Sequence, residues 1–199
     1  ARGIVTGKLR HLDDPGLRPG AGDFVLATPL EPGRMLVLER LQPRTQLTRR
    51  SAGTRTRPQA LGANLDVVFL VSSLNQEFNP RRLERYISVV RSAGVTPVLI
   101  LNKSDLVDDP SPYLQACEEI APGCACHVVG ALHQRGLDAI RSHLGPGRTG
   151  ALLGSSGVGK STLTNALLGA QAQVTQDIRG DDDEGRHTAT NRALFLLPE

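Results

Sequence analysis

One stretch of this chain constrains its fold and its chemistry more than any other. Residues 154–162 read Gly-Ser-Ser-Gly-Val-Gly-Lys-Ser-Thr and fit G-x-x-x-x-G-K-[ST], the pattern of a phosphate-binding P-loop. The glycines allow backbone conformations that a Cβ would forbid, so successive N–H groups can point inward and surround an anion. The residues predicted to bind the phosphates are Gly154, Ser155, Ser156, Gly157, Val158, Gly159, Lys160, Ser161 and Thr162.

The residues on either side of this loop supply the context that a P-loop requires. Residues 149–153 form a short apolar run typical of a strand, and residues 160–168 are helix-prone, with Gly169 as a stop signal. The helix adds the positive end of its dipole to the anion site. Lys160 is placed to reach the β- and γ-phosphates, and the Ser161 hydroxyl is placed to ligate Mg²⁺. The sequence therefore predicts a nucleoside triphosphate site with a magnesium ion.

Composition sets only broad limits. The 199 residues suggest one domain or two small ones, and a hydrophobic content of 39% is enough for a core. The formal net charge of +3 is a weak indication of an anionic partner. The cysteines at 117, 124 and 126 lack a second pair at zinc-like spacing, so we expect reduced thiols of a cytoplasmic protein. We see no signal peptide and no apolar run of membrane-spanning length, so we expect no membrane partner.

Residues 1–48 are predicted to form a small β-rich domain. Three strand-like runs, at residues 4–7, 23–27 and 35–38, alternate with Asp-Pro-Gly, Arg-Pro-Gly and Glu-Pro-Gly turns. Short strands separated by such turns favour a small barrel. An OB-fold is the natural candidate, although three clear strands are fewer than its five.

Residues 49–65 are predicted to be a basic linker. No acidic residue occurs from Arg40 to Leu65. The arginines of this window are Arg40, Arg44, Arg49, Arg50, Arg55 and Arg57. Ser, Thr, Gly and Pro lie between them, which is typical of a mobile loop. Two interpretations carry about equal weight: a solvated loop, or a contact with an RNA backbone beside the barrel.

Residues 66–199 change to an alternation of buried strands and helices. The first strand, at residues 67–71, is continuously apolar, as in sheets that are covered on both faces. Further strands are predicted at residues 97–101, 126–129, 149–153 and 193–197, and helices at residues 80–93, 112–121, 137–144 and 160–168. This order predicts an α/β domain with a mainly parallel sheet and with ligands at the carboxyl ends of its strands.

The base of the nucleotide is predicted by Asn102, Lys103, Ser104 and Asp105, which follow the strand at residues 97–101. Guanine presents two donors on one edge, N1–H and the exocyclic amine, and the Asp105 carboxylate can accept both. Asn102 can bond N7, and the Lys103 stem can lie over the base. Adenine would leave a desolvated carboxylate unpaired, at a cost of roughly 2–3 kcal/mol or more. We therefore expect guanine rather than adenine.

This guanine motif precedes the P-loop, which reverses the usual order in GTPases. The sequence resembles a circularly permuted GTPase, most closely the ribosome small-subunit-dependent GTPase A family (RsgA, also called YjeQ), over essentially the whole chain. The matching stretches are residues 22–25 (Gly-Asp-Phe-Val), 63–66 (Ala-Asn-Leu-Asp), 102–105, 154–162 and 185–190 (Gly-Arg-His-Thr-Ala-Thr). The resemblance implies an N-terminal OB-fold, a permuted GTPase domain and a C-terminal zinc domain. It also implies a factor of late small-subunit maturation that binds ribosomal RNA and hydrolyses GTP faster on the subunit.

The resemblance also implies roles for single residues. Gly130 and Ala131 stand where the family usually has Ser-Ala, so the Ala131 N–H would bond guanine O6. Thr188 and Thr190 occupy the switch I position, and one of them, with Thr190 preferred, would complete the Mg²⁺ shell beside Ser161. His187 matches the histidine that helps to position the attacking water. By residue type alone, a histidine in a polar loop is simply exposed.

Two departures from the family pattern limit what the chain can do alone. The family's Asp-Thr-Pro-Gly motif and its cysteine-rich zinc domain are expected after Glu199, where this sequence stops. We therefore expect a fragment of a monomer that binds GTP or GDP with Mg²⁺, and we expect Zn²⁺ only in the C-terminal domain absent here. Two function classes stay open: an enzyme, the subunit-stimulated GTPase, and a nucleotide-gated RNA-binding module in which hydrolysis is incidental.

Overall fold

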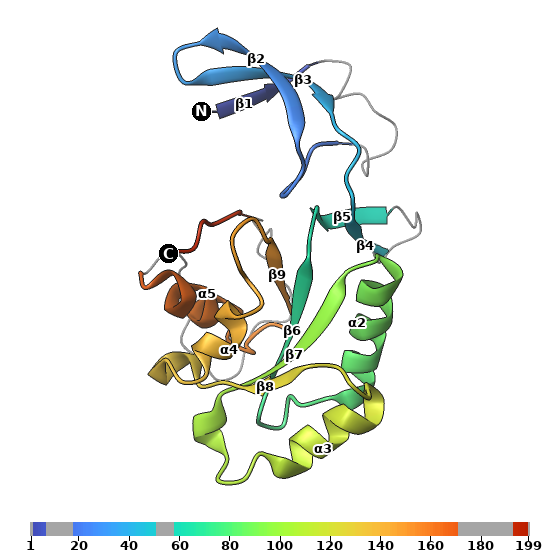
Figure 1. Cartoon of the computed structure of the whole chain (residues 1–199), viewed down its shortest axis with the longest axis vertical. Helices are drawn as coiled ribbons and strands as arrows, with labels where there is room; N and C mark the ends of the chain where they lie inside the picture. The colour runs from blue at the N-terminus through green and yellow to red at the C-terminus, as the bar shows by residue number, and fades with distance from the viewer. Residues whose placement is uncertain (1, 7–17, 51–57, 171–192, 199) are drawn as a thin grey trace, which may run out of the picture. The chain divides into compact units, whose positions relative to one another are not determined.

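The computed structural model describes residues 2–6, 18–50, 58–170 and 193–198 (Figure 1). The chain divides into two compact units, Ala1–Leu65 and Asp66–Glu199. His187, Thr188 and Thr190 lie outside the described residues, as do Arg55 and Arg57. Each unit is built from its own sheets.

The second unit is organised around a four-stranded sheet in the order β8-β7-β6-β9, in which every neighbouring pair is parallel. Its strands are β6 (Val67–Ser73), β7 (Thr96–Asn102), β8 (Cys126–Val128) and β9 (Gly150–Leu153). All seven residues of β6 are buried, as its unbroken apolar run predicts for a parallel sheet covered on both faces. The predicted α/β class with a parallel sheet is confirmed.

Helices cover both faces of this sheet. They are α2 (Pro80–Ser92), α3 (Ser111–Ile120), α4 (Leu137–Arg141) and α5 (Lys160–Leu168), with the short 3₁₀ turns η2 (Ser104–Leu106) and η3 (Ala131–His133). Figure 1 shows α2 and α3 on one face and α4 and α5 on the other. The predicted helices are therefore confirmed, although α4 is shorter than the sequence indicated.

The core follows the alternation of side chains along the strands. Val67, Phe69 and Val71 of β6 share one face and pack in a single cluster with buried residues of α4 and α5, including Ile140 and Leu163. On α2, the residues at helical spacing that become buried are Leu83, Ile87 and Val90, and this helix contacts β6 and β7. The aliphatic core thus fixes each helix to its own face of the sheet.

The strand order contains one reversal of direction. The chain steps from β6 to β7 to β8 along one side and then places β9 on the other side of β6. The segments that follow β6 and β9 therefore leave neighbouring strand ends toward opposite faces, which is the topological switch point where open α/β sheets bind ligands. The P-loop follows β9, so the fold brings it to this point.

The first unit contains two small sheets. The strands β1 (Arg2–Val5), β3 (Arg34–Arg40) and β2 (Val25–Glu31) form one sheet in that order, and β4 (Gln46–Arg50) pairs with β5 (Pro58–Ala63) in the other. The three predicted N-terminal strands are present. Within residues 2–6, 18–50 and 58–65 these strands do not close into a barrel.

Strands β4 and β5 were missed by the sequence analysis, which predicted a linker over residues 49–65. Arginine-rich β4 and Pro- and Gly-containing β5 carry little strand propensity and no clear apolar alternation. They pair in an antiparallel hairpin with a register shift at Leu47 and Thr48. Leu47 is almost fully buried, which shows that tertiary packing rather than propensity specifies this hairpin.

Gly22 and Asn64, from two of the family-like stretches, meet in this unit. Asn64 is buried with a positive φ of 54°, its Nδ2 donates to the Gly22 carbonyl at 2.8 Å, and its Oδ1 accepts from the Arg44 N–H at 2.9 Å. Gly22 has a φ of 86°, and a Cβ there would lie 2.1 Å from the Ala63 carbonyl oxygen. One amide and one glycine therefore join the segment before β2 to the end of β5.

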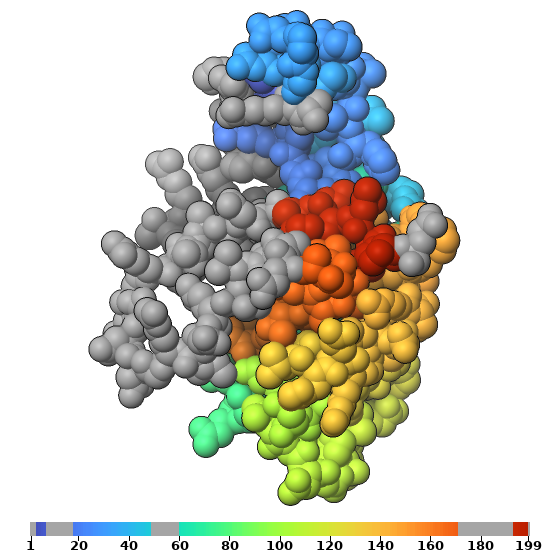
Figure 2. Space-filling model, turned by 90° about the vertical axis from the view of Figure 1, so that its left-hand side faces the viewer, coloured from blue at the N-terminus to red at the C-terminus, as the bar shows by residue number. Residues whose placement is uncertain are grey.

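The final described segment, residues 193–198, forms no strand, contrary to the prediction for residues 193–197. Its Leu197 packs against the core cluster that contains Leu163 and Leu167 of α5. Figure 2 shows this segment in red on the surface beside the orange atoms of the α5 region. Leu194 and Leu196 are exposed, so this segment contacts the core through Leu197 and does not pair in the sheet. Among the described helices, none has the length and apolar character that crossing a membrane would require.

We predict that Asn64→Ala lowers the free energy of unfolding by about 1–3 kcal/mol, because it removes two part-buried hydrogen bonds, to the Gly22 carbonyl and from the Arg44 N–H, and places alanine at a positive φ. Urea denaturation of the protein measures the change. Asn64→Gly is the matched control, because it permits the same φ and removes the same two bonds. A loss below about 0.5 kcal/mol for Asn64→Ala would contradict a structural role for the amide.

Candidate functional site

The predicted site residues lie at the carboxyl edge of the parallel sheet. Asn102 is the last residue of β7, and the P-loop at residues 154–159 connects β9 to α5. Because all four strands run in the same direction, their carboxyl ends share one edge of the sheet. The fold therefore brings together two motifs that are about fifty residues apart in the chain.

Three glycines of the P-loop have conformations or neighbours that exclude a side chain. Gly157 and Gly159 have φ values of 77° and 93°. A Cβ on Gly154 would lie 2.3 Å from the Val71 carbonyl oxygen, and one on Gly159 would lie 2.3 Å from Asn102 Nδ2. The loop is therefore packed tightly against the ends of β6 and β7, while Ser156 and Gly157 at its middle are exposed. This is the arrangement that a phosphate cradle needs: fixed at its ends and open at its centre.

Lys160, the first residue of α5, folds back over the loop. Its Nζ donates to the Gly154 carbonyl at 3.0 Å and to the Ser155 carbonyl. Burial lowers the pKa of the Lys160 ammonium from its ordinary value. An ammonium group has three N–H donors, so one remains after these two contacts. A charged, half-buried lysine with a remaining donor is suited to binding an anion.

Asn102 joins the P-loop to the segment after β8. Its side chain is 2% exposed, its Nδ2 donates to the Val158 carbonyl at 2.9 Å, and its Oδ1 accepts from the Ala131 N–H at 3.1 Å. From the sequence, the Asn102 amide is expected to bond guanine N7, and the family resemblance implies a bond from the Ala131 N–H to guanine O6. In the structure both groups bond within the protein, so the principal work of Asn102 is to hold three segments in register. The Asn102 amide group has two N–H donors, and the second is not used in the bond to Val158.

Asp105 lies in the turn η2, which is separated from β7 by Lys103 alone. Lys103 has a φ of 63°, and the Ser104 N–H donates to the Val129 carbonyl at 3.2 Å. The left-handed residue turns the chain away from the strand, and the Asp105 side chain is exposed. An exposed carboxylate can accept hydrogen bonds from a ligand without first leaving a partner in the core.

The glycine at position 130 has a packing reason that the sequence analysis did not find. Gly130 forms an isolated antiparallel bridge with Arg135, and a Cβ on Gly130 would lie 2.8 Å from the Ser104 Oγ. The hydroxyl of Ser104 thus occupies the space beside residue 130. Only a pairwise comparison of positions 104 and 130 could have indicated this from sequence.

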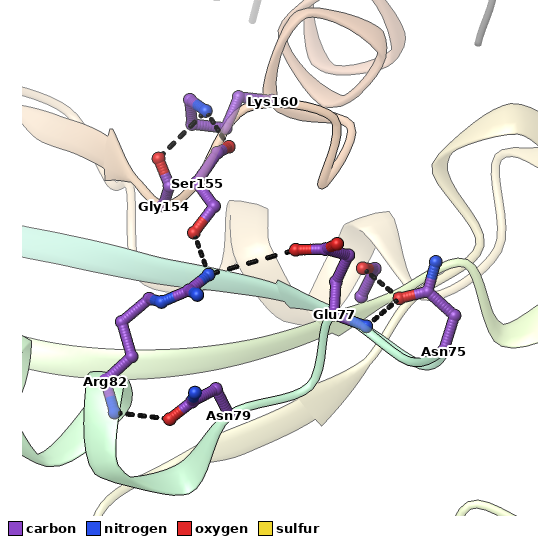
Figure 3. A network of polar contacts seen from close by, with 8 residues as sticks. Asn75, Glu77, Asn79, Arg82, Gly154, Ser155 and Lys160 are labelled. Carbon is purple, nitrogen blue, oxygen red and sulfur yellow. Dashed lines mark hydrogen bonds and ion pairs between the residues drawn. The ribbon is translucent and has the colours of Figure 1, made fainter. Parts of the chain in front are cut away.

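Arg82 was also missed. It lies in the first turn of α2, and its Nη1 donates to the Ser155 Oγ (Figure 3). The Asn79-Pro80 start signal predicted the helix, but nothing in the local sequence indicates that an arginine there reaches the P-loop. The contact follows from the strand order, which places β6 beside β9.

The described residues fit a nucleotide with Mg²⁺. The cradle is closed to side chains at Gly154 and Gly159, and the Ser161 hydroxyl lies in the first turn of α5, where a P-loop ligand to Mg²⁺ is needed. No group of three or more His, Cys, Asp and Glu side chains in the described ranges is arranged to hold a metal ion. A magnesium ion at Ser161 would therefore depend on the nucleotide phosphates for most of its ligands.

We predict that Gly130→Ala destabilises the protein by about 1 kcal/mol, because the new methyl group crowds the Ser104 hydroxyl. Combining it with Ser104→Ala removes the crowding oxygen and should restore most of the loss. Thermal denaturation of the two single variants and the double variant measures this. If the two substitutions simply add, the packing interpretation is wrong, because residues in contact show coupling.

Comparisons with known proteins agree with this geometry. The profile of the RsgA GTPase family matches residues 40–199. A curated relative from Methanosarcina acetivorans, named small ribosomal subunit biogenesis GTPase RsgA, is 46% identical over 195 residues, which are 98% of this chain and 52% of that protein. The chain thus spans about half the length of that relative.

Solved structures share the fold. A crystal structure of YjeQ from Thermotoga maritima matches with a TM-score of 0.63 and 26% identity, over 82% of this chain and 55% of that one. YloQ, described as a circularly permuted GTPase, matches with a TM-score of 0.56 and 20% identity, over 83% of this chain and 54% of that one. At that identity YloQ supports the fold alone. Since the family profile covers most of the sequence, including both nucleotide motifs, the chain belongs to the RsgA GTPase family.

Proposed function

We propose that this protein binds and hydrolyses GTP as a factor in the late maturation of the small ribosomal subunit, acting in the cytoplasm and contacting ribosomal RNA. The observation that carries the proposal is the Asn102 side chain, which ties the guanine motif to the P-loop through Val158 and Ala131. The printed names of the curated relatives, small ribosomal subunit biogenesis GTPase RsgA, support the ribosomal part.

The P-loop residues hold the phosphates in this proposal. Backbone N–H groups of residues 154–162 surround the anion, and Lys160 adds a cation to the β- and γ-phosphates. Ser161 ligates Mg²⁺ together with Thr190 or Thr188, with Thr190 preferred. The bound magnesium ion supplies charge neutralisation at the phosphates.

The base is held by the residues after β7 and β8. Asp105 accepts from guanine N1–H and the exocyclic amine, with the Lys103 stem over the base and Ser104 and Gly130 shaping the loop. Ala131 N–H can reach guanine O6 only by sharing its hydrogen with Asn102 Oδ1, at 3.1 Å. The proposal therefore rests base selection chiefly on Asp105.

Hydrolysis and partner binding are assigned to residues that the structure does not describe, or whose side chains it does not describe. His187 orients the attacking water, and its neutral imidazole accepts a hydrogen bond from that water near neutral pH. In the proposal residues 1–48 belong to an OB-fold-like domain, and the basic segment at residues 49–65, which includes Arg49, Arg50, Arg55 and Arg57, contacts the RNA backbone. We propose a monomer with domains at residues 1–48 and 66–199, and Zn²⁺ only in a C-terminal domain beyond this sequence.

We predict that Asp105→Asn weakens GTP and GDP binding by about 10- to 100-fold, because one acceptor oxygen becomes a donor that faces the donors of guanine. The same variant should gain affinity for xanthosine diphosphate, whose 2-oxo group accepts. Titration with fluorescent nucleotides measures both. Asp108→Asn, an exposed carboxylate in the same loop, is the matched control. Unchanged GDP affinity for Asp105→Asn would remove this residue from the site.

The function as a whole is tested by GTP turnover with and without small ribosomal subunits. We predict stimulation by the subunit, and we predict that His187→Ala in the full-length protein lowers the stimulated single-turnover rate by about 10²-fold while GTP binding is nearly unchanged. A rate within a few-fold of the unmodified protein would contradict a role for His187 in positioning the attacking water. Subunit binding that depends on GTP, without any stimulation of turnover, would instead favour the nucleotide-gated RNA-binding module.

A further inference from the structure

Arg82 is the cationic side chain that links α2 to the P-loop (Figure 3). Asn79 caps the helix, since its Oδ1 accepts from the Arg82 N–H at 3.0 Å, and Pro80 occupies the first turn. The cap fixes the backbone of Arg82 at the start of the helix. The Cα of Arg82 therefore has a fixed position, and Figure 3 shows its side chain extending to Ser155.

The guanidinium has one weak acidic neighbour. Its Nη1 lies 4.0 Å from Glu77 Oε2, and the two side chains are 33% and 59% exposed. A pair of this length and exposure contributes little, so Glu77 does not neutralise Arg82 fully. The segment that carries Glu77 is itself ordered, because Asn75 Oδ1 accepts from the Glu77 N–H and from the Ser73 hydroxyl. The principal acceptor of Nη1 is the neutral hydroxyl of Ser155.

Ser155 is shared between two cations. Its hydroxyl accepts from Arg82 and its carbonyl accepts from Lys160 Nζ. The position of the Ser155 peptide thus determines where the lysine ammonium rests, and Arg82 restrains that peptide from the opposite side. At the far end of the loop, Asn102 Nδ2 donates to the Val158 carbonyl and restrains the backbone there.

The strand order explains why the contact forms at this place. Arg82 belongs to the helix after β6, and Ser155 belongs to the loop after β9, its parallel neighbour. These strands flank the reversal of strand order, where the following helices depart to opposite faces. Arg82 therefore spans the switch point at which α/β sheets bind anionic ligands.

We propose that Arg82 is a positioning residue of the phosphate site: through the Ser155 hydroxyl it fixes the first half of the P-loop and thereby the ammonium of Lys160. This inference rests on the proposed function, since it presumes that the loop binds nucleotide phosphates. Arg82 raises nucleotide affinity by pre-organising Lys160, so replacing Arg82 should weaken the binding of both GDP and GTP.

Four variants of the protein test this with a fluorescent GDP analogue as the probe. Arg82→Ala should raise the dissociation constant about tenfold, the size expected for a lost charged hydrogen bond that is partly exposed. Ser155→Ala should raise it to a similar degree, and the double variant should be no weaker than the single ones, because both remove the same contact. Arg82→Lys, which keeps a donor and the charge, should recover part of the affinity. Arg81→Ala, which removes an exposed arginine one residue away, is the control and should bind as the unmodified protein does.

The outcomes separate the possible failures. Additive losses in the double variant, or equal affinities for Arg82→Ala and Arg81→Ala, overturn the inference and leave the proposed function standing. Failure of the unmodified protein to bind GDP overturns the proposed function and the inference with it. If Arg82→Ala does not fold, Arg82→Gln takes its place in the cycle with Ser155→Ala: unchanged GDP affinity of either variant overturns the inference, and losses of about tenfold that do not add in the double variant support it.

Discussion

The arrangement of this site depends on a single buried amide. Asn102 has both ends of its side chain satisfied by backbone groups, one from the P-loop and one from the segment after β8. Replacing it by an apolar residue would leave a buried carbonyl and a buried N–H unpaired, each at a cost of about 1–3 kcal/mol. Because the two partners belong to the phosphate half and the base half of the proposed site, this amide makes the two halves one structural unit. The Gly159 backbone packs so closely on the Asn102 amide that a Cβ at residue 159 would collide with Nδ2. This close contact restricts where the Asn102 side chain can lie.

This dependence on strand ends explains how a reversed order of motifs can still give a nucleotide site. The guanine motif follows β7 and the P-loop follows β9, yet both end at the same edge because the sheet is parallel throughout. The contacts that join them run between neighbouring strand ends, and such contacts do not depend on which strand the chain builds first. What the chain order does change is the connection: α2 and the loop at residues 74–79 come before the motifs, which brings Arg82 to the P-loop from an element that carries neither motif.

The sequence predicted the second unit well and the first unit less well, for different physical reasons. Continuous apolar runs such as Val67–Val71 and the helical spacing of Leu83, Ile87 and Val90 are strong signals, because one burial pattern explains them. The hairpin of β4 and β5 is specified by long-range contacts, such as those of buried Leu47 and Asn64, whereas its local sequence has the composition of a loop. The strand predicted at residues 193–197 is absent, because an apolar segment can pack one residue against the core without pairing in a sheet. In the site, the motifs were found from spacing, whereas the Gly130–Ser104 and Arg82–Ser155 contacts join distant positions and leave no local pattern.

The charges at the two ends of the proposed site favour one orientation of a bound nucleotide. The P-loop from Gly154 to Lys160 contains no carboxylate and is contacted by two cations, Lys160 and Arg82, while Asp105 lies beyond β7 on the side of the base motif. Burial lowers the pKa of Lys160, which means that its charge is costly until an anion approaches. A nucleotide has the complementary polarity, with anionic phosphates at one end and, in guanine, a donor edge at the other. Bound in reverse, it would bring the phosphates toward Asp105 and leave the lysine uncompensated, so repulsion at one end and desolvation at the other both act against that orientation. Asn102 lies between the two ends and carries no charge. Its hydrogen bonds to Val158 and Ala131 therefore do not depend on the charge of a ligand, and the amide can hold both halves of the site with or without one.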